Sequence, residues 1–209
     1  SYVQFGKAKL NKKGKRIVVN PLSGLINARD KLKQQLVLEQ RGIRKPRFFT
    51  NVNDAIEFIK ETGNPIVAKR HFHSKGRGMK KFTTPEELEN DLSVHNGYYY
   101  QEFVKCNREW RIHVSRFQAT EVVAYRKCYT KEVTDGYRAN DLDKPWFRNL
   151  ENCYFKLDVE ADKMEWWDEM VLECKRAIEA LGMDIAGVDV GENTKVDGGK
   201  FYIYEVNSA

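Results

Sequence analysis

Three oxygen-bearing side chains lie close together in the last predicted hairpin of this 209-residue sequence. Asp189 falls in a predicted strand at 185–190, and Glu205 and Asn207 fall in or just after a second strand at 201–206. Because side chains alternate along a strand, Glu205 and Asn207 share one face, which Asp189 can join from its antiparallel partner. Hard cations such as Mg²⁺ take oxygen ligands of this kind. The pattern indicates a magnesium site, although an ordinary hairpin with polar residues at its solvent end would have the same pattern.

A lysine and a glycine-bearing loop form a second candidate group. Lys69 lies in a predicted strand at 66–71, and the loop that follows contains Ser74, Gly76 and Gly78. The backbone N–H groups of such a loop can cover phosphates while the lysine ammonium balances their charge. Glycine also permits a close backbone approach that a side chain would obstruct. The loop is not a Walker A sequence, and it does not identify a phosphate site by itself.

A third group begins where a predicted apolar strand at 98–104 ends in Gln-Glu-Phe-Val. The end of such a strand can present backbone donors and acceptors to the edge of an adenine ring, here from Glu102, Phe103 and Val104. Glu109 follows seven positions after Glu102. A plain core strand would also explain this segment, so it becomes informative only together with the other two groups.

Hydrophobic periodicity and turn residues predict an α+β protein around these groups. Helices are predicted at 28–41, at 53–60 with Asn53 as N-cap, from Thr84 onward, and at 166–181. Strands are predicted at 47–50, 66–71, 98–104, 110–116, 121–126, 185–190 and 201–206, with a hairpin turn at 197–199. The segment 129–158 has few periodic apolar positions, so we expect an extended loop region there, and loops of this length are often functional.

Composition limits the class of protein. Hydrophobic residues make up 41% and charged residues 32% of the chain, as in ordinary globular proteins. There is no apolar run of the roughly 20 residues that a membrane span needs and no signal-peptide pattern, so we expect no membrane partner and a cytoplasmic location. The four cysteines are widely spaced and are expected to be reduced.

The net charge of +6 favours an anionic partner such as nucleic acid, an acidic protein or the phosphates of a nucleotide. Six lysine and arginine residues cluster between positions 7 and 16. We interpret residues 1–27 as a basic lead-in whose charged residues form a solvated arm.

Taken in order, these segments resemble the ATP-grasp superfamily, in particular its ribosomal-protein-glutamylase-like and D-alanine–D-alanine-ligase-like members. The resemblance begins at Asp30-Lys31 and continues through the Lys69 strand, the 74–78 loop, the Gln-Glu-Phe-Val hinge and the strand at 108–114. Ala-Gly-Val-Asp-Val at 186–190 and Tyr-Glu-Val-Asn-Ser-Ala at 204–209 complete it, and these two motifs are the most specific.

The resemblance implies the ATP-grasp fold, in which two α+β lobes with antiparallel sheets sandwich a nucleotide. It implies an ATP-grasp domain at 28–209, with a small lobe at about 47–104 and a larger lobe at about 105–209 plus 28–46. The N-terminal domain that usually precedes this fold would be largely absent. Family members also commonly continue past the Asn-Ser-Ala motif, so the chain would be incomplete there.

The resemblance also implies a role for each matching residue. Lys31 and Lys69 become phosphate ligands of ATP together with the loop residues Ser74, Gly76 and Gly78, whereas Glu102, Phe103 and Val104 form the adenine site and Glu109 the ribose site. Asp189, Glu205 and Asn207 become ligands of Mg²⁺, with Mn²⁺ as an alternative ion. Arg111 and Arg126, with Lys69, are assigned to catalysis, and Arg148, Asn149 and His113 are assigned to the substrate side.

The implied activity is that of an ATP-dependent carboxylate–amine ligase. A carboxylate is a poor electrophile, so it first attacks the γ-phosphate of ATP to give an acyl phosphate, from which an amine then displaces phosphate. Lysines, arginines and Mg²⁺ stabilise the charge on the transferring phosphoryl group, and no covalent protein nucleophile is required. The sequence does not identify the carboxylate or the amine.

Three alternatives compete with this interpretation. Lys-Val-Asp-Gly at 195–198 matches the signature of ligases that form a lysyl-adenylate, but the long nucleotide-binding region that must follow it is missing. A zinc site at His71 and His73 lacks a cysteine with supporting spacing. A basic nucleic-acid-binding module, or a ligase that modifies a nucleic acid or a protein, is compatible with the charge and the aromatic residues.

Overall fold

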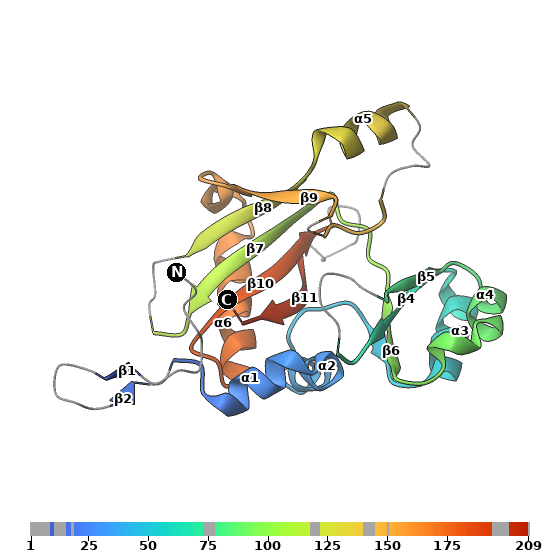
Figure 1. Ribbon diagram of the computed structural model, residues 1–209, viewed down its shortest axis with the longest axis horizontal. Coiled ribbons are helices and arrows are strands. Elements are labelled where there is room, and N and C mark those ends of the chain that lie inside the picture. Colours follow the sequence, from blue (N-terminus) through green and yellow to red (C-terminus); the bar gives the residue numbers. More distant parts are fainter. Residues whose placement is uncertain are drawn as a thin grey trace.

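The computed structural model describes residues 9–10, 16–17, 19–72, 78–117, 122–139, 145–149, 151–193 and 201–208. Two antiparallel sheets dominate these residues, one of five strands in the order β11-β10-β7-β8-β9 and one of four in the order β3-β6-β4-β5 (Figure 1). The short strands β1 (Lys9–Leu10) and β2 (Arg16–Ile17) pair with each other. In the described residues no helix is long and apolar enough to span a membrane.

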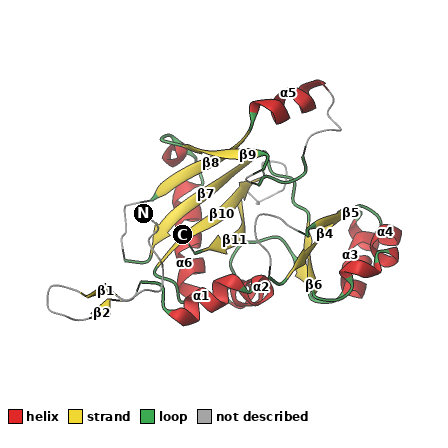
Figure 2. Ribbon diagram, viewed as in Figure 1, coloured by secondary structure: helices red, strands yellow, loops and turns green. Residues whose placement is uncertain are grey.

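The four-stranded sheet forms the small lobe together with two helices. Its strands are β3 (Phe48–Phe49), β4 (Ile66–Arg70), β5 (Lys80–Phe82) and β6 (Tyr98–Glu102), and its helices are α3 (Val52–Thr62) and α4 (Pro85–Asn90). Figure 2 shows both helices on the side of this sheet that faces away from the larger sheet. Ile66 and Ala68 point into the core beneath the helices, and alternation therefore turns Val67 and Lys69 toward the larger sheet.

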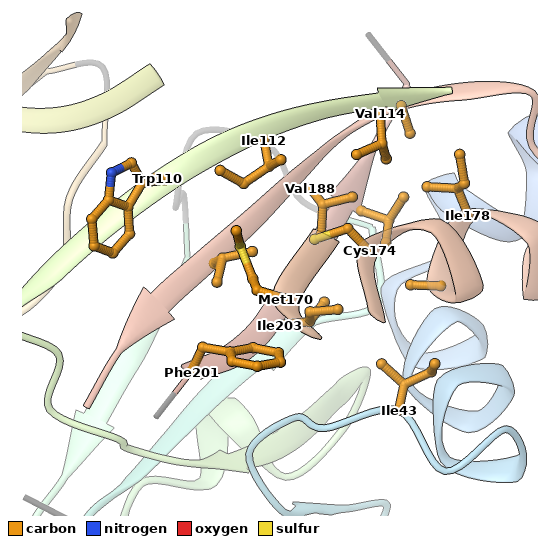
Figure 3. Packing of buried hydrophobic residues seen from close by; sticks show 14 of the residues in the cluster. Ile43, Trp110, Ile112, Val114, Met170, Cys174, Ile178, Val188, Phe201 and Ile203 are labelled. Atoms are coloured by element: carbon orange, nitrogen blue, oxygen red, sulfur yellow. The ribbon is translucent and has the colours of Figure 1, made fainter. Parts of the chain in front are cut away.

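The five-stranded sheet forms the large lobe with helix α6 (Trp167–Ala180) against one face. Its strands are β7 (Arg108–Ser115), β8 (Val123–Tyr129), β9 (Cys153–Leu157), β10 (Ile185–Glu192) and β11 (Phe201–Asn207). Figure 3 shows Met170, Cys174 and Ile178 of α6 packed against side chains of the sheet such as Ile112 and Val188. Burying each large apolar side chain contributes roughly 1.5–3 kcal/mol. The opposite face of the sheet is left for polar side chains.

Two further helices connect the lobes. Helices α1 (Leu22–Arg29) and α2 (Lys31–Gln40) meet at Asp30, whose carboxylate accepts a hydrogen bond of 3.0 Å from the Lys33 N–H and so caps α2. The sequence pattern predicts a single helix at 28–41, and this prediction is wrong at its start. The chain is extended at Asp30, with a ψ of 104°, and the Lys31 N–H donates to the carbonyl oxygen of His71 at 2.8 Å and not to a carbonyl of α1.

Other predicted elements are confirmed with small shifts in their ends, apart from two regions. Helix α3 is capped by Asn51, which accepts from the Asp54 N–H, and not by Asn53. The predicted extended loop at 129–158 contains helix α5 (Lys131–Ala139) and edge strand β9. Most side chains of β9 are exposed, so it lacks the apolar alternation by which a half-buried strand is found. The predicted turn at 197–199 lies outside the described residues.

Candidate active site

A cleft of about 690 Å³ separates the polar face of the large sheet from the face of the small sheet that lies opposite α3 and α4. Its volume is in the range of ligand sites in proteins, which is about 300–1,000 Å³. Both lobes and the segment 145–149 contribute to its walls. The charged residues that line it are Arg29, Lys31, Lys69, Glu102, Glu109, Arg111, Lys127, Arg148, Asp189 and Glu205.

Two carboxylates lie side by side on the large-lobe wall. Asp189 of β10 pairs directly with Glu205 of β11, and Gly187 pairs with Asn207, so that all three predicted oxygen ligands share one face. Arg111 of β7 forms a two-pronged ion pair with Asp189, at 2.8 Å from Nε to Oδ1 and 2.9 Å from Nη2 to Oδ2. Burial alone would raise the pKa of Asp189, but the charges of Lys127 and Arg111 lower it to about 2. Asp189 is therefore ionised at neutral pH.

A β-bulge places an additional side chain beside this carboxylate pair. The register passes from Asp189–Glu205 to Val190–Ile203, which leaves Tyr204 as the extra residue of β11. Tyr204 lines the cleft, and its hydroxyl donates to the carbonyl oxygen of Val104 at 3.1 Å. A Cβ on Gly191 would lie 2.5 Å from the Tyr204 ring, so glycine is required there. The bulge thus ties the large lobe to the end of β6.

Lys31, at the first position of α2, reaches the same wall. Its ammonium lies 2.6 Å from Oε1 of Glu205 and donates to the carbonyl oxygens of Ala28 at 3.0 Å and Val206 at 3.2 Å. It also lies 3.4 Å from Oδ1 of Asn207. The side chain is 7% exposed. A predicted phosphate ligand is therefore held next to two predicted metal ligands.

Lys69 is the cation that the small lobe contributes to the described wall of the cleft. Its ammonium donates to Oε1 of Gln101 at 2.5 Å. Burial lowers the pKa of Lys69 to about 8, an effect that Glu205 and Glu109 oppose and Lys31 and Lys127 reinforce. Lys69 is consequently a lysine that is close to losing its charge just above neutral pH.

The predicted adenine and ribose residues lie together at one end of the cleft. Phe103 packs edge-on against Trp146, with ring centroids 6.1 Å apart. Glu109 accepts from Arg148 at 2.6 Å, and the Arg148 guanidinium also lies 4.7 Å from the centroid of the Tyr129 ring. This end is bounded by aromatic side chains, which suits a flat base.

The structure brings together most of the predicted site residues. Those that line the cleft are Lys31, Lys69, Glu102, Phe103, Val104, Glu109, Arg111, Arg148, Asn149, Asp189, Glu205 and Asn207. Ser74 and Gly76 lie outside the described residues. Gly78 has a φ of +73°, which glycine adopts easily, but it does not line the described cleft.

Arg126 is a wrong prediction, because the structure turns it away from the cleft. It pairs with Trp110, whose side chain is buried in the core beneath α6, so Arg126 is exposed on that opposite face of the sheet. Its neighbour Lys127 faces the cleft instead, with its ammonium 3.1 Å from Oδ2 of Asp189 and 3.8 Å from Oε2 of Glu109. Asp189 and Glu109 raise the pKa of Lys127 against the effect of burial.

His113 shares the polar face of the large sheet but does not line the cleft. Its ring lies edge-on to Tyr125, with centroids 5.6 Å apart, and opposite Gly187. Burial and the charge of Arg111 lower its pKa, although Asp189 opposes this effect. His113 is therefore a neutral neighbour of the site.

Sequence reasoning missed further side chains at the cleft, among them Lys127, Trp146 and Gln101. A lysine in a strand does not by itself indicate which face it occupies, so Lys127 cannot be assigned to the cleft without the register of β8. Trp146 lies in a segment that lacks the periodic apolar positions by which a helix or strand is predicted. Gln101 is the first residue of the Gln-Glu-Phe-Val hinge motif, but only its contact with Lys69 reveals what its side chain does.

The three predicted oxygen ligands fit a hard cation. Asp189, Glu205 and Asn207 supply only oxygen donors from one sheet face, which matches Mg²⁺ better than a soft metal. Among the described residues no three His, Cys, Asp or Glu side chains form a metal-binding group, and the third predicted ligand is the amide of Asn207. Both carboxylates are paired with cations of the chain, Glu205 with Lys31 and Asp189 with Arg111.

Comparison with known proteins identifies the fold. No family model matches the sequence. The chain is 25% identical over 199 residues to a tetrahydromethanopterin:alpha-L-glutamate ligase of Methanococcus maripaludis, an alignment that covers 91% of this chain and 61% of that protein.

Solved structures of ATP-grasp proteins superimpose on most of this chain. A complex of the ATP-grasp ligase PsnB with a minimal precursor superimposes with a TM-score of 0.63 at 20% identity, over 94% of this chain and 58% of that chain. D-alanyl-alanine synthetase A from Vibrio cholerae O1 biovar eltor superimposes with a TM-score of 0.66 at 15% identity, over 90% and 58%. The protein therefore has the α+β fold of the ATP-grasp superfamily, and it spans about three-fifths of the length of these relatives.

Proposed function

We propose that this chain carries the nucleotide-binding and bond-forming part of an ATP- and Mg²⁺-dependent carboxylate–amine ligase. The observation that supports this most strongly is the convergence of four cations, Lys31, Lys69, Arg111 and Lys127, on the cleft that also holds Asp189 and Glu205. Cations from two lobes around a carboxylate pair suit a metal-bound triphosphate. The ATP-grasp fold of the chain supports the same assignment.

In this proposal one nucleotide lies along the whole cleft. The adenine ring occupies the aromatic end beside Phe103 and Val104, and Glu109 binds the ribose once Arg148 yields to it. Lys69 and Lys31 bind the phosphates from opposite lobes. Asp189, Glu205 and Asn207 hold Mg²⁺, or Mn²⁺ in its place, which neutralises charge on the phosphates.

The reaction proceeds in two displacement steps. A carboxylate oxygen of the first substrate attacks the γ-phosphorus, the bond from phosphorus to the bridging oxygen breaks, and ADP leaves. The nitrogen of an amine then attacks the acyl carbon, the C–O bond to phosphate breaks, and the amine loses a proton. Arg111, and Lys127 in place of Arg126, stabilise the oxygens that gain charge.

The names of the relatives suggest the classes of substrate to test. One relative is named as a glutamate ligase, and structures of PsnB are described with a precursor peptide and AMPPNP or with Mg and ADP. We therefore propose an amino acid or a peptide as the partner substrate. A nucleic-acid partner, which the net charge left open, gains no support from these relatives.

A coupled assay of ADP release tests the proposal directly. The protein is incubated with Mg²⁺, ATP and pairs of carboxylates and amines that include L-glutamate and short peptides. We expect ADP and phosphate to appear only with a matching pair, and mass spectrometry to find the amide product. Lys69→Met is expected to lower the rate of ADP release by about 10²–10³-fold, and Lys60→Met, at an exposed lysine of α3, serves as the matched control.

Absence of ADP release with every pair does not by itself separate a missing substrate from a wrong function. Thermal stabilisation by Mg²⁺ and AMPPNP makes that distinction, because it needs no second substrate. A protein whose melting temperature does not respond to the nucleotide contradicts the proposal.

A further inference from the structure

Two buried glutamine side chains join the lobes beside the cleft, which Gln101 lines. Gln35 lies on α2 and Gln101 on β6, and they are 1% and 2% exposed. Nε2 of Gln35 donates to the carbonyl oxygen of Tyr204 at 3.2 Å, and Nε2 of Gln101 donates to Oε1 of Gln35 at 3.3 Å. Lys69 then donates to Oε1 of Gln101 at 2.5 Å. These contacts form a continuous amide relay from β11 to Lys69.

Lys69 fixes the direction of this relay. An ammonium group only donates hydrogen bonds, so the atom of Gln101 beside Lys69 must be its carbonyl oxygen. The amide nitrogen of Gln101 therefore faces Gln35, whose oxygen accepts and whose nitrogen is left to donate to the Tyr204 carbonyl. Each amide has one orientation that satisfies both neighbours, and a buried amide without partners is costly.

The relay begins and ends at the two lobes that must bind one ligand. Gln35 lies one helical turn after Lys31 on α2, so both side chains leave the same face of that helix. Lys31 contacts Glu205 of β11, and Gln35 contacts Tyr204 of the same strand. Lys69 and Gln101 are diagonal neighbours on the cleft face of the small sheet. A single helix thus holds the large-lobe carboxylate and the small-lobe lysine in register.

The ammonium form of Lys69, at the end of the relay, is disfavoured by its surroundings and gains from an oriented hydrogen-bond acceptor. The charged groups that face Lys69 are Glu205 and Glu109, which favour its charged form, and Lys31 and Lys127, which oppose it. Burial adds to the opposition and brings its pKa to about 8. A fixed carbonyl dipole from Gln101 stabilises the ammonium in one position between these charges.

We propose that Gln35 and Gln101 are positioning residues, which hold the Lys69 ammonium at the nucleotide site and fix its place relative to β11 and Glu205. This inference rests on the proposed function, because the nucleotide phosphates are the partner for which Lys69 is positioned. The two glutamines do not touch the reacting atoms. Their effect passes through Lys69.

Lysine titration followed by NMR tests the relay without any substrate. The lysine side chains are labelled with ¹³C at Cε, and the Lys69 signal is assigned by its loss in Lys69→Arg. We expect Gln101→Leu to lower the Lys69 pKa below its wild-type value, because the ammonium loses its acceptor. Gln101→Glu should raise it, because a carboxylate then faces the ammonium. Gln40→Leu, at an exposed glutamine of α2, is the matched control.

Binding of Mg²⁺ and AMPPNP, measured by calorimetry, supplies a second readout. Gln101→Leu removes a hydrogen bond to a charged group and should raise Kd about tenfold. Gln35→Leu removes the hydrogen bonds that link Gln101 to Tyr204 and should raise Kd about threefold. The double variant should bind no more weakly than Gln101→Leu, since both act through one relay.

The outcomes separate the relay from the proposed function. An unchanged Lys69 titration in a folded Gln101→Leu protein overturns the relay, and if that variant does not fold, Gln35→Leu and Gln101→Glu decide the question. Failure of the wild-type protein to bind the nucleotide contradicts the proposed function instead, and the titration still tests whether the relay holds Lys69.

Discussion

The large lobe lines the cleft with a network of ion pairs, whereas the small lobe lines it with apolar side chains, Gln101, Glu102 and a single lysine in the described residues. On the large lobe Asp189 is paired with Arg111 and Lys127, Glu205 with Lys31, and Glu109 with Arg148. On the small lobe, Val67, Met79 and Phe103 surround Lys69 in the described wall.

This difference separates two tasks. The paired charges of the large lobe stabilise one another, so their arrangement is part of the fold before any ligand binds. The pKa of Lys69 is lowered, and its ammonium contacts the neutral amide of Gln101. The charged form of Lys69 therefore destabilises the folded protein. A phosphate would satisfy it. We conclude that the large lobe assembles the site and that the small lobe completes it around the nucleotide.

Asp189→Asn should have the largest effect on stability. The change leaves Arg111 and Lys127 without their shared carboxylate, and removing one partner of a buried ion pair costs about 3–5 kcal/mol. Urea unfolding without nucleotide measures this loss, with Asp162→Asn at an exposed position as control. Equal unfolding free energies for the two variants would show that the network of ion pairs of the large lobe does not support the fold.

Lys69→Met should reduce the activity of the protein without reducing its stability. The unfolding free energy at pH 7 should not fall, because a lysine with a depressed pKa destabilises the folded state at pH values where it is protonated in both states. Ligase turnover should fall by about 10²–10³-fold, as when one stabilising group is removed from a transition state. A variant that loses stability but keeps turnover would assign Lys69 to the structure of the small lobe.

Lys127→Met and Arg126→Met form a matched pair on adjacent positions of β8. Lys127 contacts Asp189 and Glu109 in the cleft, so its loss should reduce turnover by at least about tenfold, the value of one charge-assisted contact. Arg126 is exposed on the other face, and its loss should change turnover less than twofold, as for a surface residue. The opposite ranking would mean that the cleft face of β8 has been misassigned.

The pH dependence of nucleotide binding gives a graded effect, which requires no substitution to observe. The free protein loses the Lys69 proton as the pH rises through about 8, and phosphate favours the charged form. Affinity for Mg²⁺ and AMPPNP should therefore be full below pH 8 and fall above it, approaching about tenfold per pH unit. Lys69→Arg stays charged and should remove this decline. Calorimetry between pH 7 and pH 9.5 measures both profiles.

Much of the site could be predicted from the sequence because it lies on regular strands. Alternation on the last hairpin is enough to place Glu205 and Asn207 on one face with Asp189, and the structure confirms that register. Lys69 likewise lies in a strand that is predicted from the apolar run Ile66-Val67-Ala68, and all three of these residues are buried. Short-range patterns carry this information without any knowledge of tertiary packing.

The wrong predictions arise where packing or register decides the outcome. Arg126 and Lys127 are adjacent cations, and only the pairing of β8 with β7 determines which of them faces Asp189. The break between α1 and α2 coincides with a hydrogen bond from the Lys31 N–H to the carbonyl oxygen of His71, which is distant in sequence. The relay from Gln35 to Gln101 joins residues 66 positions apart, and no local pattern reveals it.

Calorimetry of AMPPNP with and without Mg²⁺, on the wild-type protein and on Lys69→Met and Glu205→Ala, tests most directly whether the two lobes share one nucleotide. We predict one nucleotide per chain, dependence on Mg²⁺ in the wild type, and weaker binding in both variants, one from each lobe. No binding by the wild-type protein, or binding that survives both substitutions unchanged, would contradict the account.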